Sequence, residues 1–271
     1  ILNVDADHLE FFGSMDNLKQ SFRRFALLTE HAIVANLDDA NTREVLKSVD
    51  RNVITFGIDT PADYHAVHIE EYRPSFFAFD IVEKGVPTAH IRLAVPGRHN
   101  IYNALAAYAC AAMFGCTSEQ CKSGLEAFRG AGRRFEFLGE VNGVTIADDY
   151  AHHPAELEAT LTSAAKMDYR KVWAVFQPFT YSRTQMLLDD FARVLSIADH
   201  VVLTEIMGSR EKAEDYNIHT QDLAAKIPGS VCFSTFEEVT DYVMKNAQPG
   251  DLVITLGCGD IYKAAKMMCR S

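Results

Sequence analysis

The second half of the chain repeats one pattern, in which a short apolar run predicted as a strand precedes a longer amphipathic run predicted as a helix. The predicted strands are residues 144–147, 172–176, 200–203, 231–233 and 252–256. The predicted helices are residues 154–167, 183–197, 220–226 and 236–246, with a last one after Gly259. This alternation favours a parallel sheet with helices on both faces. Ligands of such sheets bind outside the carboxyl ends of the strands, so we expect functional residues there.

The first half has a different pattern. It predicts helices at residues 15–29, 42–48, 101–114 and 117–128, and short strands at 32–37 and 53–56. Between residues 64 and 95, three extended runs broken near Arg73-Pro74 and Lys84-Gly85 indicate an antiparallel β section. Gly130-Ala131-Gly132 then separates the two patterns. At ~150 residues per domain, the length favours two domains. We therefore predict an α/β protein with domains at residues 1–130 and 131–271.

Charge and composition exclude several functions. The 26 lysines and arginines against 37 acidic residues give a net charge of −11, which argues against broad nucleic-acid binding. A small anion held by a few local arginines remains compatible with that charge. The longest apolar run, residues 101–114, is too short to span a bilayer and indicates no membrane partner. The six cysteines form no CxxC pair, which argues against a zinc knuckle, and Cys110 and Cys116 are interpreted as small core residues. We expect reduced thiols and a cytoplasmic protein.

The first polar cluster is Asp5-Ala6-Asp7-His8, directly after an apolar run. A carboxylate and an imidazole at the end of a strand can hold a divalent cation beside a phosphate. The alternative is a simple turn in which Asp7 caps the next segment. The chain opens inside an apolar run without a methionine, so we expect an upstream part to be missing.

The second cluster is Gly97-Arg98-His99-Asn100-Ile101-Tyr102-Asn103, at the start of a predicted helix. Asn100 and Asn103 are three residues apart and would lie on one face of its first turn. Their amides offer both a donor and an acceptor, which a purine edge requires. The alternative is N-capping of the helix by Asn100.

Two further clusters follow at the proposed domain boundary. Arg133 and Arg134 place two guanidinium groups in a glycine-rich loop, where they either hold a phosphate or pair with nearby acids. Asp148-Asp149-Tyr150-Ala151-His152-His153-Pro154 joins a strand to a helix that Pro154 begins. Adjacent histidines usually point apart, so we interpret this string as a substrate-facing loop and not as a dinuclear metal site.

The last two clusters also follow predicted strands. In Phe176-Gln177-Pro178-Phe179-Thr180-Tyr181-Ser182-Arg183-Thr184, Arg183 would open a helix, where the helix dipole disfavours a cation. An arginine kept there suggests an anionic partner such as a carboxylate, and the alternative is a surface ion pair. Gly257-Cys258-Gly259-Asp260 contains only GxG, so we interpret it as a tight turn between a strand and a helix.

Taken together and in order, these clusters resemble those of the Mur ligases of peptidoglycan synthesis. The resemblance covers the whole chain and rests on Asn3…Asp7-His8-Leu9, Gly97-Arg98-His99-Asn100…Asn103, Arg133-Arg134-Phe135, the string Asp148 to Pro154, and Phe176-Gln177-Pro178…Ser182-Arg183-Thr184. It implies a UDP-binding domain, a central ATPase domain and a carboxy-terminal Rossmann-like domain. Residues 1–130 would then be the later part of the central domain, and residues 131–271 the doubly wound carboxy-terminal domain.

Within that family, the chain is most similar to members that join L-alanine to UDP-N-acetylmuramate. The resemblance implies ATP and Mg²⁺ as cofactors, activation of the muramate carboxylate as an acyl phosphate, and attack by the amine of L-alanine. It implies that His8 is a metal ligand and that Asn100 and Asn103 contact adenine. It further implies that Arg134 lies near the nucleotide and Asp149 near its ribose.

The resemblance also implies that Tyr150, His152 and Arg183 face the muramate or the amino acid and act in catalysis. Asp149 and His152 are both candidates to assist proton transfer, and the general base stays unassigned. Some relatives have a second arginine where Thr180 stands, which leaves the substrate contact there open.

The chain contains neither G-x-x-x-x-G-K-[ST] nor any Gly-Lys dipeptide, so it lacks the phosphate-binding loop. The family's acidic metal ligand upstream of His8 is absent too. We therefore expect an inactive part of a longer ligase. Two alternatives stay open: a ligase that attaches murein tripeptide to UDP-N-acetylmuramate, and a nucleotide- or sugar-binding module without catalysis.

Overall fold

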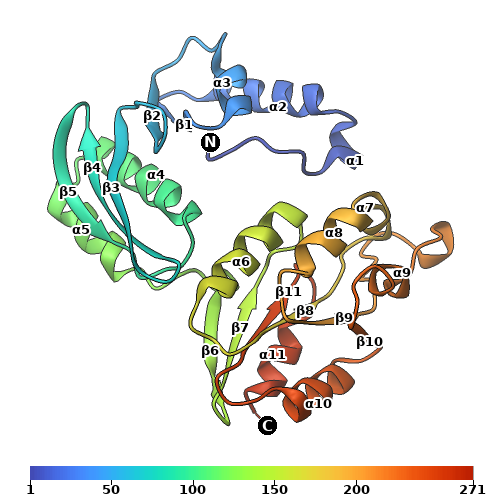
Figure 1. Cartoon of the computed structure of the whole chain (residues 1–271). Coiled ribbons are helices and arrows are strands. Elements are labelled where there is room, and N and C mark those ends of the chain that lie inside the picture. Colours follow the sequence, from blue (N-terminus) through green and yellow to red (C-terminus); the bar gives the residue numbers. More distant parts are fainter. Residues whose placement is uncertain (271) are drawn as a thin grey trace. The chain divides into compact units, whose positions relative to one another are not determined.

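A computed structural model describes residues 1–270 of the chain. Two compact units divide the chain at Ile1–Arg129 and Gly130–Ser271, and each has its own β-sheet (Figure 1). The protein is therefore a mixed α/β protein. No described helix combines the length and the apolar character needed to cross a membrane.

The second unit contains a six-stranded sheet in the order β10-β9-β8-β11-β7-β6 (Figure 1). Its strands are β6 (Glu136–Val141), β7 (Val144–Asp149), β8 (Val172–Phe176), β9 (His200–Thr204), β10 (Val231–Phe233) and β11 (Leu252–Leu256). Its helices are α6 (Pro154–Lys166), α7 (Tyr181–Met186), α8 (Leu188–Leu195), α9 (Thr220–Ala224), α10 (Phe236–Asn246) and α11 (Tyr262–Met268), with a 3₁₀ turn at Ala213–Asp215. Five strands and the crossover helices thus match the sequence expectation.

Successive residues of a strand point to opposite faces of the sheet, so a strand that is apolar throughout gives the sheet two apolar faces. Helices cover both of them. In β8, Ala174 and Phe176 pack with α6, α8 and α9 on one face. Trp173 and Val175 pack with α10 and α11 on the other face. This is the doubly wound arrangement that the alternating pattern predicted.

Two details differ from the prediction. β6 is antiparallel to β7, so the sheet is not wholly parallel, and a short turn at Asn142-Gly143 joins the two strands. The predicted helix at residues 183–197 begins earlier, at Tyr181, and is divided at Leu187. The residue Leu187 leaves helical geometry, with φ −110° and ψ 23°, which ends α7 before α8 begins.

The first unit contains a five-stranded sheet in the order β1-β2-β3-β4-β5. Its strands are β1 (Ile33–Asn36), β2 (Val53–Gly57), β3 (Tyr64–Arg73), β4 (Phe76–Glu83) and β5 (Val86–Arg92). The first three strands are parallel and the last three form an antiparallel section, as the sequence predicted for residues 64–95. The parallel pair β2–β3 joins these two parts into one sheet, which the sequence did not indicate.

The helices of this unit are α1 (Leu9–Phe12), α2 (Met15–Leu28), α3 (Ala40–Leu46), α4 (His99–Met113) and α5 (Ser118–Ala127). The predicted capping signals are confirmed: Ser14 caps α2, and Thr117 with Gln120 forms a capping box at α5. The interpretation of Cys110 and Cys116 as core residues is wrong, since both are exposed. Cys110 is not on the buried face of α4, which consists of Ile101, Ala104, Leu105, Tyr108 and Ala109, and Cys116 lies beyond the end of that helix.

Candidate functional site

The polar clusters of the second unit meet at the carboxyl edge of its sheet. Leu256, the last residue of β11, is in register with Asp149 of β7 and with Phe176 of β8. The chain leaves β7 and β8 toward one face of the sheet and leaves β11 toward the other face. Such a reversal between neighbouring strands opens a crevice, and this is where doubly wound proteins bind ligands.

Arg133 anchors the loop before β6 to this edge. Its Nε donates to Asp148 Oδ2 at 2.8 Å, and its Nη2 donates to the carbonyl of Gly257 at 2.7 Å. The guanidinium carbon also lies 4.9 Å and 4.7 Å from the ring centroids of Tyr150 and Tyr262. Of the two predicted outcomes for Arg133, ion pairing with an acid is therefore the one observed.

Arg134 differs from its neighbour because its side chain is 59% exposed and its nearest acidic atom, Glu156 Oε1, is 3.9 Å away. Its guanidinium carbon lies 5.6 Å from the Tyr150 ring centroid. The two adjacent arginines therefore have different environments. Arg133 binds the loop to the sheet edge, whereas the charge of Arg134 faces solvent beside the exposed ring of Tyr150.

Asp149 is 6% exposed and organises the loop that follows β7. Its Oδ1 accepts the N–H of Ala151 at 2.8 Å, and its Oδ2 accepts the N–H of Phe135 and the hydroxyl of Thr160, both at 3.0 Å. Burial raises the pKa of Asp149, and these hydrogen bonds oppose that rise. The geometry favours a positioning role, and the contact with ribose stays a prediction.

The two histidines of the loop serve different ends. His153 is the N-cap of α6, where its Nδ1 accepts the N–H of Ala155 at 3.4 Å, and Pro154 is the first residue of the helix. His152 Nδ1 lies 3.1 Å from the carbonyl of Tyr150 and 3.2 Å from Glu156 Oε2. Because one ring caps the helix and the other packs edge-on to Tyr150, they do not share a metal site. The interpretation of the string as a substrate-facing loop stays a prediction.

Arg183 lies in α7, two residues after its start, and is 6% exposed. A substrate carboxylate as the partner of Arg183 stays a prediction. Burial raises the pKa of the Cys258 thiol to about 11, and the positive charge of Arg183 opposes this rise, so the guanidinium lies near the turn after β11. Thr180, at the N-cap of α7, has φ 63°, a strained backbone angle for a β-branched residue. Strain of this kind is frequent at binding loops.

The turn after β11 requires glycine for steric reasons, as the sequence predicted for a tight turn. A Cβ on Gly259 would lie 2.5 Å from both Gln177 Oε1 and Met207 Sδ. A Cβ on Gly257, where φ is 141°, would lie 2.9 Å from the carbonyl of Gln177. The loops after β8 and β11 are therefore in direct contact.

In the first unit, Asn100 and Asn103 lie on one face of α4, as predicted. Asn103 Nδ2 donates to Asn100 Oδ1 at 2.8 Å, and Asn100 Nδ2 donates to the carbonyl of Pro96 at 2.7 Å. The alternative of N-capping by Asn100 is wrong, because the helix begins at His99 and Arg98 is its N-cap. Asn103 is exposed, so its amide oxygen and one N–H face solvent.

Asp38 organises the loops of the first unit around α4, a role that the sequence did not indicate. Its carboxylate accepts the backbone N–H groups of Ile58, Asp59 and Thr60 at 2.6–3.0 Å and the hydroxyl of Tyr102 at 3.1 Å. Burial would raise the pKa of Asp38, but these hydrogen bonds lower it to about 2. The carboxylate thus ties the end of β1 and the loop after β2 to the helix that carries Asn103. The sequence feature that could have indicated this role is the pair of acids Asp38-Asp39, which directly follows the apolar run at residues 32–37.

His8 is the N-cap of the short helix α1, and its Nε2 lies 3.6 Å from Asp7 Oδ2. Asp7 Oδ1 accepts the N–H of His8 at 2.8 Å, and the alternative in which Asp7 caps the next segment stays a prediction. Among the side chains that the structure describes, which leave out that of Glu10, no group of three or more His, Cys, Asp or Glu could hold a metal ion. His8 as a metal ligand stays a prediction.

Comparisons with known proteins assign both units to one family. Residues 1–111 match the Mur ligase middle domain, and residues 133–259 match the Mur ligase glutamate ligase domain. The UDP-N-acetylmuramate–L-alanine ligase of Caldanaerobacter subterraneus subsp. tengcongensis is 42% identical over 273 residues, which cover 98% of this chain and 59% of that protein.

Solved structures show the same fold. UDP-N-acetylmuramate–alanine ligase from Thermotoga maritima superposes with a TM-score of 0.78 at 25% identity, over 100% of this chain and 58% of that one. The MurF ligase of Thermotoga maritima, solved in complex with ADP, has a TM-score of 0.72 at 16% identity, over 99% of this chain and 59% of that one. The chain therefore spans less than two thirds of these relatives. It belongs to the Mur ligase family.

Proposed function

We propose that these residues form part of an ATP-dependent ligase that joins L-alanine to UDP-N-acetylmuramate in peptidoglycan synthesis. The observation that carries the proposal is the meeting of three polar loops at one sheet edge, where β7, β8 and β11 end in register. The name of the Caldanaerobacter relative, at 42% identity, supports the choice of substrates. The six free cysteines support a reducing compartment, and we propose the cytoplasm.

In the first unit, Asn103 would recognise the adenine of ATP. Its amide oxygen would accept from the exocyclic amine of the base, and its remaining N–H would donate to a ring nitrogen. The bond from Asn103 to Asn100 fixes the amide plane, so little rotamer entropy is lost on binding. Asp38 would position this helix through its bond with the Tyr102 hydroxyl.

In the second unit, Arg183 would hold a substrate carboxylate. A guanidinium can bind a carboxylate with two parallel hydrogen bonds, and both become stronger in a site that excludes water. Tyr150 is partly exposed beside Arg134, where it can pack against the sugar or the nucleotide. His152 is oriented by the Tyr150 carbonyl and Glu156, so it is the candidate for holding a proton near the attacking amine.

Bound Mg²⁺ would neutralise charge on the transferring phosphoryl group. We assign it to no residue beyond the prediction for His8, because the described side chains do not complete a site. The proposed work of this chain is therefore to bind and orient the nucleotide, the carboxylate and the amine.

A chimera tests the proposal. The part of the Caldanaerobacter ligase outside the aligned region would be joined to residues 1–271, and phosphate release from ATP measured with UDP-N-acetylmuramate. We expect release that requires L-alanine. Release that requires murein tripeptide instead would favour the recycling ligase. Nucleotide binding without release under either condition would favour a non-catalytic module.

A further inference from the structure

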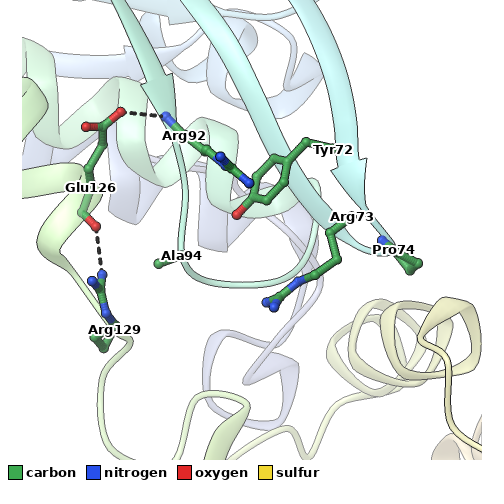
Figure 2. A pocket seen from close by; sticks show the side chains of 7 residues that line it. All are labelled: Tyr72, Arg73, Pro74, Arg92, Ala94, Glu126 and Arg129. Atoms are coloured by element: carbon green, nitrogen blue, oxygen red, sulfur yellow. Dashed lines mark hydrogen bonds between the residues drawn. The ribbon is translucent and has the colours of Figure 1, made fainter.

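An open cavity of about 840 Å³ lies in the first unit, between the ends of β3 and β5 and the end of α5 (Figure 2). Three of the residues that line it are arginines: Arg73, Arg92 and Arg129. The cavity shares no residue with the Asn100–Asn103 pair or with the loops of the second unit. Its volume is within the ~300–1,000 Å³ that is typical of small-molecule sites.

These arginines are not neutralised by acids. In residues 1–270 the arginine ion pairs are made by other side chains, and no carboxylate lies within the 4.0 Å ion-pair distance of Arg73, Arg92 or Arg129. The chain has 37 acidic residues against 26 lysines and arginines, so partners are abundant. Three neighbouring arginines without an acidic partner therefore form a local positive site on an acidic protein.

Aromatic rings hold two of the guanidinium groups in place. The guanidinium group of Arg92 lies over the ring of Tyr72 (Figure 2), with its carbon 4.0 Å from the ring centroid. The guanidinium carbon of Arg73 lies 3.5 Å from the centroid of the Phe76 ring. The Tyr72 hydroxyl donates to the carbonyl of Leu93 at 2.6 Å, which fixes the ring. Stacking covers the face of a guanidinium and leaves its in-plane N–H groups available for an anion.

The remaining polar groups of the cavity are committed to the backbone. Arg129 Nη1 donates to the carbonyl of Glu126 at 2.7 Å, and Glu126 Oε1 accepts the N–H of Arg92 at 3.1 Å (Figure 2). Three arginines and one glutamate give the lining a net charge of +2. A ligand that balances it carries at least two negative charges.

We propose that this arginine pocket (Arg73, Arg92 and Arg129) binds a small molecule through a di- or triphosphate group. Phosphate oxygens match the planar fork of a guanidinium, and adjacent phosphates supply the charge that a single carboxylate does not. The open side of the cavity leaves room for the rest of the molecule. This binding is independent of the proposed ligase reaction.

Inorganic triphosphate is the ligand for the test, titrated into the 271-residue chain by calorimetry. We expect Arg73→Ala and Arg92→Ala each to weaken binding at least tenfold, and Arg92→Lys to weaken it less, because the charge remains without the planar stack. Arg24→Ala is the matched control, an exposed arginine on α2, and should leave the affinity unchanged. Asn103→Ala should also leave it unchanged, which separates this pocket from the proposed adenine site.

Three results would overturn the proposal: no binding at millimolar triphosphate, unchanged affinity in both pocket variants, or an equal loss in Arg24→Ala. The last would indicate general electrostatic attraction. Circular dichroism checks that each variant is folded. If Arg73→Ala does not fold, Arg129→Ala supplies the second pocket variant with the same expected loss. Failure of ligation by the chimera would leave these outcomes unaffected.

Discussion

At the scale of single residues, Arg183 shows how burial changes the expected role of a side chain. An exposed arginine at a helix start is explained by a surface ion pair worth ~0–1 kcal/mol. A guanidinium that is 6% exposed at the carboxyl edge of a sheet is costly to bury unless anions or hydrogen-bond acceptors balance its charge, and the proposed substrate carboxylate would be one such anion.

We therefore predict that Arg183→Lys in the chimera lowers kcat/KM for ligation by about 10- to 100-fold, because lysine cannot reproduce two parallel bonds to a carboxylate. The thermal midpoint should change little, since the charge is kept. Steady-state kinetics and thermal unfolding measure the two effects. Arg193→Lys, which alters an exposed pair with Glu158, is the control and should leave ligation unchanged. Near-normal catalysis by Arg183→Lys would contradict the assignment.

Asn103 gives a second residue-scale prediction. In the chimera, Asn103→Ala should weaken ATP binding by about 1–3 kcal/mol, because a polar edge of the base loses its partner. The change should appear in the KM for ATP and not in that for L-alanine. Asn246→Ala is the control, because Asn246 is also an exposed helix asparagine that donates within its own helix. An effect confined to the L-alanine constant would place α4 beside a different ligand.

Asp38 allows a prediction about pH. Its folded pKa is about 2, below the ordinary value of 3.8, so the carboxylate stabilises the fold above about pH 4. That contribution is lost as the pH falls through the folded pKa. Asp38→Asn should therefore lower the free energy of unfolding at pH 7 by about 1 kcal/mol, after allowance for solvent screening. The gap from wild type should shrink toward pH 2, as urea titrations at several pH values would show.

The control for that series is Asp59→Asn, whose side chain is 73% exposed and pairs with Arg98 at 3.5 Å. Its effect should stay below about 0.5 kcal/mol at every pH, as for most surface substitutions. An Asp38→Asn gap that does not vary with pH would show that the hydrogen bonds do not depend on the carboxylate charge.

At the scale of elements, the contact between the turns after β8 and β11 can be tested with two glycines. Gly259→Ala places a methyl group 2.5 Å from Gln177 and Met207, so we expect a loss of about 1–3 kcal/mol in stability. Gly124→Ala in α5 meets nothing within 4 Å, so it should stabilise its unit by about 0.5–1 kcal/mol. Chemical denaturation compares the two, and equal effects would mean that the turns are not packed together.

The elements themselves were largely predictable, because hydrophobic periodicity and caps are local. Ser14, Thr117 and Pro154 each begin a helix as their residue types indicate. β6 was missed because it is a half-exposed edge strand containing Gly139, and its register shifts there against β7. Pairing of this kind depends on long-range contacts that a local pattern does not contain.

The candidate site was predictable in residue type but not in burial. The sequence placed polar strings after strands, and parallel register brings their ends to one edge. The sequence did not indicate that the carboxylate of Asp149 accepts hydrogen bonds from the N–H groups of Phe135 and Ala151. It also did not indicate that the carboxylate of Asp38 accepts backbone N–H groups of the loop after β2 in the first unit. Those roles depend on which backbone donors the tertiary fold leaves unpaired.

At the scale of the whole molecule, neither unit supplies a phosphate-binding loop, since no Gly-Lys dipeptide occurs. Phosphoryl transfer depends almost entirely on positioning and charge stabilisation, so a γ-phosphate that nothing holds does not react. We predict that the 271-residue chain alone releases no phosphate from ATP with L-alanine and UDP-N-acetylmuramate. The chimera is the positive control in the same assay. L-alanine-dependent release by the isolated chain would show that other residues of this chain hold the phosphates.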